Sequence, residues 1–307
     1  MKNNLEERIY SAQTIGNVEP IEYMTPYPSI RSLIEGQTIK FGEQTIIEEP
    51  NITNSELYNL INKTSNWLRR HNIKPKDKVL IPCLEYPQSE IFIYGVWNMG
   101  AVGVLPGQFS EKQVRKKIKV KSVSNSDLDL FKEIEEYSVI FNPKHKPLLR
   151  DEAVITFEKS ESLRLSHYNI LVNTNGLQKA IHLKSRLKFY CDLPPISSSW
   201  VVFQTILPIY SGCIFTKNSP DLTIGLSKTN YTLRYDLKNI KNYSEFDIGI
   251  CPENSAVLSV GKTPIHLSHY MLDENQITIQ GHSVMMGYLD DKENRLRFNE
   301  NGLTIPI

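Results

Sequence analysis

Mostly apolar residues recur at helical spacing early in the chain, directly after a sequence pattern that marks the start of a helix. Thr53 and Glu56 form the Thr-x-x-Glu pattern of a capping box. The positions that then fall on one helical face are Leu57, Leu60, Ile61, Thr64 and Leu68. The pattern predicts an amphipathic helix over about 54–71, ended by the turn-forming residues 72–77.

A strand–helix–strand pattern follows this helix. Residues 78–83 form a short apolar run that is typical of a buried strand. A second helix carries apolar residues between Ile91 and Trp97, and residues 100–106 predict a turn and another strand. This spacing is typical of a βαβ unit, so we expect the two strands to lie parallel in one sheet.

The rest of the chain predicts a second α/β half and then a β-rich segment. After a polar stretch over 111–150, the pattern predicts strands at 153–157, 187–191 and 213–215 and helices over 166–180 and 200–210. Beyond residue 216, short β-like runs at 248–250, 256–260 and 276–279 have no helix between them, which favours antiparallel or barrel-like structure. A last helix is expected over 290–298.

The expected fold is therefore α/β, with two α/β subdomains that hold mostly parallel sheets and a small β-rich segment. The expected ranges are 1–150, 151–216 and 217–307, and the last of them ends in a short helix. The chain has 307 residues and 40% hydrophobic content, which is enough for one large domain or two.

Composition narrows the class of protein. The formal net charge is +1 and the pI is about 7.7, which disfavours nucleic-acid binding. The mean hydropathy is −0.33, and no apolar run approaches the roughly 20 residues that span a bilayer, so no membrane association is expected. Residues 1–8 are polar and form no signal core, so a cytoplasmic location is expected. The four cysteines are far apart, which argues against a disulfide framework or a zinc ribbon.

Several short motifs occur in a fixed order along the chain. They lie at 53–57, 73–79, 95–102, 166–169 (Ser-His-Tyr-Asn) and 281–288 (Gly-His-Ser-Val-Met-Met-Gly-Tyr). From about Tyr23 onward, this order resembles the adenylate-forming (acyl-CoA synthetase-like, AMP-binding) enzymes. The resemblance implies a large domain of two α/β subdomains, and an activity that joins a carboxylic acid to AMP from ATP with magnesium.

The stretch that corresponds to the family's phosphate loop departs from the pattern. A loop that cradles phosphates needs glycines, so that backbone amides can approach the anion, together with hydroxyls and a lysine. Residues 157–165 contain no glycine, and they carry Glu158 and Glu161, which would repel a triphosphate. What remains at this degenerate phosphate-loop position is Lys159, Ser160, Ser162 and Arg164.

Other parts of that family's catalytic set have no counterpart here. The aromatic-Gly-x-Thr-Glu motif, whose Glu binds magnesium in the family, is not found between Gly212 and Gly261. The Asp that binds the ribose would follow Gly302, but residues 303–307 contain none. We expect no C-terminal small domain in this chain, and therefore no catalytic lysine of the family type.

The expected function is that of a degenerate ligase-like protein, inactive alone, which acts as a binding or assembly subunit. No catalytic residue, metal or cofactor is expected. The expected partner is a biosynthetic enzyme, an acyl carrier protein or a second copy of the chain. The alternative is a minimal acid-activating enzyme that borrows a partner domain and uses ATP or AMP with Mg²⁺. A transferase acting on a preformed thioester is a weaker third idea, because the sequence offers no nucleophile or base for it.

Candidate pocket residues are those near the degenerate loop and in the family-like motifs. They are His167, Asn169, Ser197, Ser198 and Tyr288. Each has a structural alternative: Ser166 caps a helix beside His167, and Ser197 and Ser198 start a helix. His266, His269 and Asp273 lie in a strand and turn, where the two rings need not converge on a metal.

A dense basic run is the candidate partner surface. It consists of Lys112, Arg115, Lys116, Lys117, Lys119 and Lys121. Such a run is usually a solvated helix face, but it would also suit an acidic partner such as an acyl carrier protein. A second expected interface is an exposed apolar face near Met285, Met286 and Tyr288, because no small domain would cover it.

Overall fold

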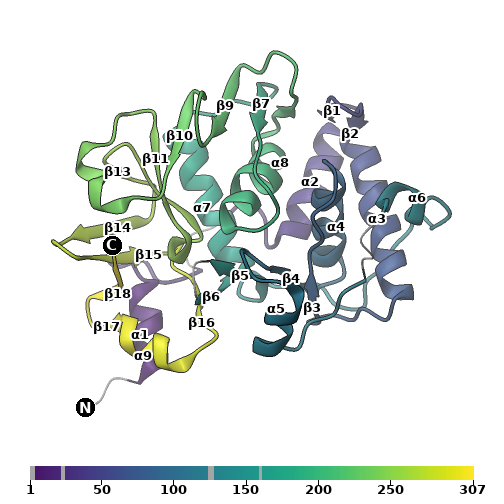
Figure 1. Ribbon diagram of the computed structural model, residues 1–307. Coiled ribbons are helices and arrows are strands. Elements are labelled where there is room, and N and C mark those ends of the chain that lie inside the picture. The colour runs from purple at the N-terminus through teal and green to yellow at the C-terminus, as the bar shows by residue number, and fades with distance from the viewer. Residues whose placement is uncertain (1–3, 22–24, 124–127, 159–160) are drawn as a thin grey trace.

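Three sheets organise the chain, in a computed structural model that describes residues 4–21, 25–123, 128–158 and 161–307. Two of the sheets have a mostly parallel centre and carry helices, and the third is a smaller antiparallel sheet that lies beside both chain ends (Figure 1). The α/β class and the mostly parallel sheets confirm the prediction from sequence.

The five-stranded sheet contains the predicted βαβ unit. Its order is β16-β6-β5-β4-β3, with bounds Gly287–Tyr288, Glu161–Ser166, Glu152–Glu158, Val102–Leu105 and Lys78–Leu80. Strands β3, β4 and β5 are parallel, and α4 (Gln88–Asn98) connects the first two, as predicted. Strands β5 and β6 form an antiparallel hairpin, and β16 pairs with β6 on its other side.

The nine-stranded sheet holds most of the second half of the chain. Its order is β13-β12-β11-β10-β9-β7-β8-β1-β2, with bounds Thr263–Pro264, Ala256–Val260, Asp247–Cys251, Tyr231–Arg234, Leu222–Gly225, Lys188–Cys191, Ile214–Phe215, Thr45–Ile47 and Ile52–Thr53. Strands β1, β8, β7, β9, β10 and β11 form a continuous parallel run. At one edge β12 pairs antiparallel with β11 and β13 with β12, and at the other edge β2 pairs antiparallel with β1.

Beyond residue 216 the expected antiparallel pairing is present for the runs at 248–250 and 256–260, which pair as β11 and β12, and for the run at 276–279 in β15. It was wrong for β9 and β10 and for the pairing of β11 with β10, all of which are parallel. These strands extend the parallel sheet without α-helical crossovers. A short loop at 226–230 joins the first two, and the 3₁₀ turn η2 (Leu237–Asn242) lies between the last two. A parallel connection usually contains a helix, and no helical pattern occurs between these strands. The sequence therefore predicted the wrong strand direction.

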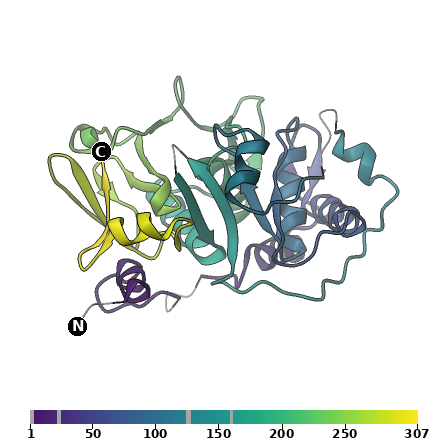
Figure 2. The same cartoon turned by 60° about the horizontal axis from the view of Figure 1, so that its bottom comes forward.

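The third sheet lies against the N-terminal helix. Its order is β14-β15-β18-β17, with bounds Ser268–Leu272, Gln276–Gly281, Gly302–Pro306 and Phe298–Asn299. Helix α9 (Asp291–Arg297) precedes β17, close to the predicted last helix. Helix α1 (Leu5–Ala12) packs on β15, β17 and β18, although it lies at the opposite end of the sequence (Figure 2).

The expectation of an exposed apolar face near Met285, Met286 and Tyr288 was wrong for two of these residues. Met285 is fully buried and Tyr288 is 2% exposed, while Met286 is half-buried. Gln13, directly after α1, donates its side-chain amide to the carbonyl oxygens of Val284 and Met285 at 3.1 and 3.0 Å. The N-terminal segment therefore packs against the motif that the sequence argument left uncovered.

Some of the remaining helices were predicted from the sequence, and the others lie in stretches where the hydrophobic pattern was too weak to predict a helix. They are α2 (Ile30–Phe41), α3 (Asn54–Arg70), α5 (Glu111–Lys117), α6 (Leu130–Ile134), α7 (His167–Ala180) and α8 (Leu207–Ser211), with the π-helix η1 (Trp200–Ile206). The predicted capping box of α3 is present, with Thr53 Oγ1 accepting from the Glu56 amide at 3.2 Å. Within the described part of the chain, none of the helices has the length and hydrophobicity that a bilayer span requires.

Candidate functional site

A cleft opens where six parallel strands end. Strands β4 and β5 of one sheet and β7, β9, β10 and β11 of the other all point their carboxyl ends at it. The residues that line it from these ends are Gln108, Glu158, Leu193, Leu226, Tyr235 and Pro252. Its volume is about 320 Å³. Ligands of open α/β sheets bind at this edge, because the loops after the strands converge there.

Most of the cleft wall is apolar. Its apolar and aromatic lining comes from Phe157, Leu193, Pro194, Ile196, Leu226 and Tyr235. Gly107 is needed where β4 passes close to β5: its φ is +60°, and a Cβ there would lie 1.7 Å from the Phe157 carbonyl oxygen. A largely apolar cavity with few polar groups is the usual form of a small-molecule site.

Glu158 is the carboxylate at the edge of this cleft. Its Oε1 accepts from the Ser198 backbone amide at 2.7 Å and from Thr156 Oγ1 at 3.1 Å. Burial raises the pKa of Glu158, and these hydrogen bonds oppose the rise. The Ser198 contact ties the loop after β7 to the end of β5. It therefore holds the two sheets together at the cleft.

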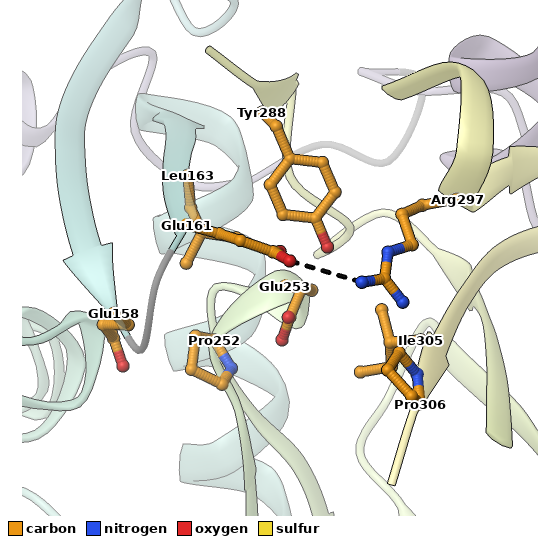
Figure 3. A pocket seen from close by; sticks show the side chains of 9 residues that line it. All are labelled: Glu158, Glu161, Leu163, Pro252, Glu253, Tyr288, Arg297, Ile305 and Pro306. Carbon is orange, nitrogen blue, oxygen red and sulfur yellow. Dashed lines mark hydrogen bonds and ion pairs between the residues drawn. The ribbon is translucent and has the colours of Figure 1, made fainter. Parts of the chain in front are cut away.

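A smaller acidic pocket adjoins the apolar cleft. It encloses about 60 Å³ and shares Glu158 and Pro252 with the cleft. Its other charged lining residues are Glu161, Glu253 and Arg297 (Figure 3). Arg297 Nη2 lies 3.3 Å from Glu161 Oε1. Burial raises the pKa of Glu161, although Arg297 lowers it.

Tyr288 lies over the acidic pocket. Its side chain is almost fully buried, and its hydroxyl has no hydrogen-bond partner among the described residues. Burial raises its pKa strongly, and the nearby Glu253 and Glu161 add to the rise. Figure 3 shows the hydroxyl directed toward the side of the pocket that holds Glu161 and Arg297.

Comparisons with known proteins place this geometry in a known fold. No sequence-family model and no curated protein matches the chain. Among solved structures, the unliganded O-succinylbenzoate coenzyme A synthetase (MenE) of Bacillus subtilis is 12% identical, with a TM-score of 0.70 over 89% of this chain and 75% of that one. The chain has the fold of an adenylate-forming ligase.

Two further structures with this ligase fold are similar over most of the chain. McyG A-PCP, complexed with phenylalanyl-adenylate, is 15% identical, with a TM-score of 0.73 over 96% of this chain and 74% of that one. The N-terminal subdomain of NpsA from Klebsiella oxytoca is 15% identical, with a TM-score of 0.69 over 92% of this chain and 96% of that one.

The stretch that the sequence resemblance assigned to the phosphate-loop position is a β-hairpin. Strand β5 ends at Glu158 and β6 begins at Glu161; Lys159 and Ser160 between them lie outside the described residues. Along β6, Glu161 and Leu163 line the acidic pocket, whereas Ser162 and Arg164 alternate to the other face. Arg164 pairs there with Glu152 at 2.5 Å. Arg164 therefore neutralises Glu152 and does not face the acidic pocket.

His167 and Asn169 lie in the first turn of α7, and both are buried. The Asn169 side chain accepts from the Ser166 amide and donates to the carbonyl oxygens of His282 and Val284, both at 3.0 Å. Burial lowers the pKa of His167 to about 4, and Asp151 opposes this. These contacts fasten the 281–288 segment to α7.

The five candidate pocket residues therefore divide among different places. Ser197 lines the apolar cleft and Tyr288 lines the acidic pocket. The Ser198 backbone donates to Glu158, while its own hydroxyl is buried without a partner among the described residues. His167 and Asn169 hold the start of α7.

Sequence reasoning missed Glu253, Arg297 and Tyr235. Tyr235 and Glu253 closely follow β10 and β11, so the rule that ligands bind at the carboxyl ends of parallel strands could have found them. That rule was not applied because these strands were expected to be antiparallel. No local signal marks Arg297, which reaches the pocket from the end of α9.

The predicted basic surface lies on and after α5. Arg115 pairs with Glu111 at 2.6 Å, and Lys121 pairs with Asp77 at 2.6 Å. Lys117 lies over the Phe109 ring. The exposed lysines in the run include Lys112, Lys116 and Lys119. Helix α5 begins at Glu111, shortly after the cleft-lining Gln108, so its first turn is the part of this surface that lies nearest the cleft along the chain.

Metal ligation has no geometric support in the parts of the chain that the structure describes. Among them, no group of three or more His, Cys, Asp or Glu side chains is arranged to hold a metal ion. The carboxylates of the acidic pocket belong to this described part of the chain, so they do not form such a group.

Proposed function

We propose that this chain is a ligand-binding subunit built on the ligase fold, and that it does not form acyl-adenylates on its own. The observation that carries the proposal is the β5–β6 hairpin. At the position of the family's glycine-rich phosphate loop, Glu158 and Glu161 flank the turn and line a pocket that also holds Glu253. The proposal includes neither a nucleotide nor Mg²⁺ as cofactor.

Electrostatics is the physical reason that this pocket disfavours phosphates. Two like unit charges about 4 Å apart repel by roughly 4 kcal/mol at an effective dielectric constant of 20. The described pocket residues offer one cation, Arg297, against three carboxylates. Arg164, which the sequence offered as compensation, faces away and pairs with Glu152.

The apolar cleft supports the binding part of the proposal. It has a volume of about 320 Å³ and a mostly apolar wall, and it lies at the carboxyl ends of six strands. That wall can remove a hydrophobic ligand from water without any nucleotide chemistry.

We further propose that the bound ligand is presented to a protein partner with an acidic surface, such as an acyl carrier protein. The first turn of α5 lies near the cleft along the chain, and the exposed lysines of this helix would steer such a partner toward it. The McyG structure, which contains a PCP, has the same fold. A biosynthetic enzyme or a second copy of the chain are the other partners that co-purification and light scattering would reveal.

Pyrophosphate exchange tests the catalytic part of the proposal. We expect no acid-dependent exchange above background over a panel of fatty and aromatic acids with ATP and Mg²⁺. Acid-dependent exchange by the purified chain would contradict the proposal. Exchange that appears only after a partner protein is added would favour the alternative, a minimal acid-activating enzyme that needs a partner domain.

A further inference from the structure

The acidic pocket has an unusual balance of charge. Glu158, Glu161 and Glu253 line it together with Arg297. The guanidinium of Arg297 already serves two carboxylates, because it lies 3.3 Å from Glu161 and 3.3 Å from Glu293. Among the described lining residues, the carboxylates therefore exceed the positive charge that faces them.

The Tyr288 hydroxyl is an independent sign that something polar is missing from this pocket. It is buried without a partner among the described residues, and such a group is unfavourable unless a ligand or water satisfies it. In Figure 3 the carboxylates of Glu161 and Glu253 lie on the side of the ring that bears this hydroxyl. A phenol both donates and accepts, so it can complete the shell of a ligand that the carboxylates bind.

The missing group has the chemistry of a cation. Carboxylates only accept hydrogen bonds, so a second anion such as a phosphate would meet repulsion. A metal ion is disfavoured, because the described residues hold no cluster with metal-ligand geometry. An ammonium group has three donors and a positive charge, and it matches two carboxylates and a phenol oxygen.

The neighbouring cleft indicates what the cation is attached to. The acidic pocket and the apolar cleft share Glu158 and Pro252, so one molecule can extend from one into the other. We infer that the two pockets bind one organic amine, with its ammonium group among Glu161, Glu253 and Tyr288 and its hydrophobic part in the cleft. This inference rests on the proposed function, since it fills the phosphate position with a group of opposite charge.

Three probes of similar size and different charge test the inference on the full chain. They are 2-phenylethylamine, 2-phenylethanol and 3-phenylpropionate, which share an aromatic ring. Calorimetry or ligand-observed NMR should show the amine binding about tenfold or more tightly than the alcohol, and the propionate binding most weakly. Equal binding of amine and alcohol, or no binding of the amine, would overturn the inference.

Substitutions in the pocket locate the effect. Glu253→Gln and Glu161→Gln should each weaken amine binding about fivefold or more, while alcohol binding changes by less than about twofold. Glu133→Gln, an exposed carboxylate on α6, is the matched control and should leave amine binding unchanged. Circular dichroism checks that the variants fold. Amine affinity that survives both pocket substitutions would show that the amine binds elsewhere and would overturn the inference.

The same probes separate this inference from the proposed function. If 3-phenylpropionate binds more tightly than the amine and tightens further with ATP and Mg²⁺, both fail, because the site then behaves as an acid-activating one. If amine and alcohol bind equally and ATP has no effect, the proposed function stands and only the amine assignment fails.

Discussion

The 281–288 segment and the β5–β6 hairpin are hydrogen-bonded neighbours in one sheet, yet they relate to the ligase resemblance in opposite ways. In the first, both motif glycines are present, Gly281 at the end of β15 and Gly287 in β16, and a Cβ on Gly287 would lie 2.8 Å from Asn294 Oδ1. In the second, residues 157–165 contain no glycine, and Glu158 and Glu161 lie beside the turn. The segment with the family-like motif makes buried contacts within the fold, whereas the hairpin departs from the pattern that the resemblance implies.

The contacts explain this difference. Asn169 and the 281–288 backbone satisfy one another inside the protein, so losing either would leave buried polar groups unpaired. The hairpin needs only strand pairing, and almost any side chain permits that. Under the proposed function, the hairpin is therefore free to change in sequence, whereas the α7 contacts are not. The following predictions test this comparison.

The largest expected effect is on stability at the α7 side. Asn169→Ala removes a helix cap and two donors to carbonyl oxygens, so we expect a loss of about 3 kcal/mol in the free energy of unfolding. Urea denaturation measures it. Asn275→Ala, at an exposed turn, is the control and should change stability by less than about 0.5 kcal/mol. Equal losses of unfolding free energy in the two variants would show that the α7 contacts do not stabilise the fold in the way that the comparison assumes.

His167 predicts a pH dependence on the same side. Its folded-state pKa is about 4, below the usual histidine value of 6.5, because burial disfavours the charged ring. The unfolded chain therefore binds more protons between these values, and the stability from neutral His167 falls as pH drops from about 6.5 to 4. The loss is up to about 3 kcal/mol. In His167→Gln, denaturation midpoints should fall less steeply over this window, and an unchanged slope would count against the assignment.

Tyr288→Phe should behave differently from the α7 changes. Because the hydroxyl lacks a partner among the described residues, its removal should leave stability unchanged or raise it by about 1 kcal/mol. Thermal unfolding of the two proteins without ligand provides the measurement. A loss of about 2 kcal/mol or more would mean that the hydroxyl is satisfied in the free protein.

The α5 lysines should affect stability least. Reversing charge at Lys112, Lys116 and Lys119 should change unfolding by less than about 0.5 kcal/mol, because these side chains are exposed. Association with an acidic carrier protein should nevertheless weaken, most clearly at low salt. Surface binding assays at two salt concentrations check both statements. Carrier binding that is insensitive to the reversals would remove α5 from the interface.

Sequence predicted the local elements well where one pattern dominated. The capping box at Thr53 and the βαβ unit of β3, α4 and β4 were foreseen because periodicity and caps are local. Strands β9 to β11 were misjudged, because their direction depends on pairing with β7, far back in the sequence. The burial of Tyr288 and Met285 was missed for the same reason, since it depends on packing around the N-terminal segment and the far end of the chain.

The candidate site shows the same difference between local features, which the sequence predicted, and contacts between distant segments, which it did not. The absence of glycine from 157–165 could be read from the sequence, and it motivated the expectation of a degenerate phosphate loop. The sequence could not show that Arg164 turns to Glu152, or that Arg297 and Glu253 meet Glu161 from distant segments. Charge balance in a pocket is a property of the folded chain, so the proposal of a cationic ligand could be drawn only from the structure.

Calorimetric titration of the intact chain with ATP and Mg²⁺, and with AMP, tests the central claim most directly. The account predicts no saturable binding up to about 1 mM, a threshold that corresponds to roughly 4 kcal/mol of binding free energy. Saturable binding of either nucleotide well below that concentration, weakened by charge reversal at Arg297, would contradict it. The pocket at the β5–β6 hairpin would then be a phosphate site despite its carboxylates.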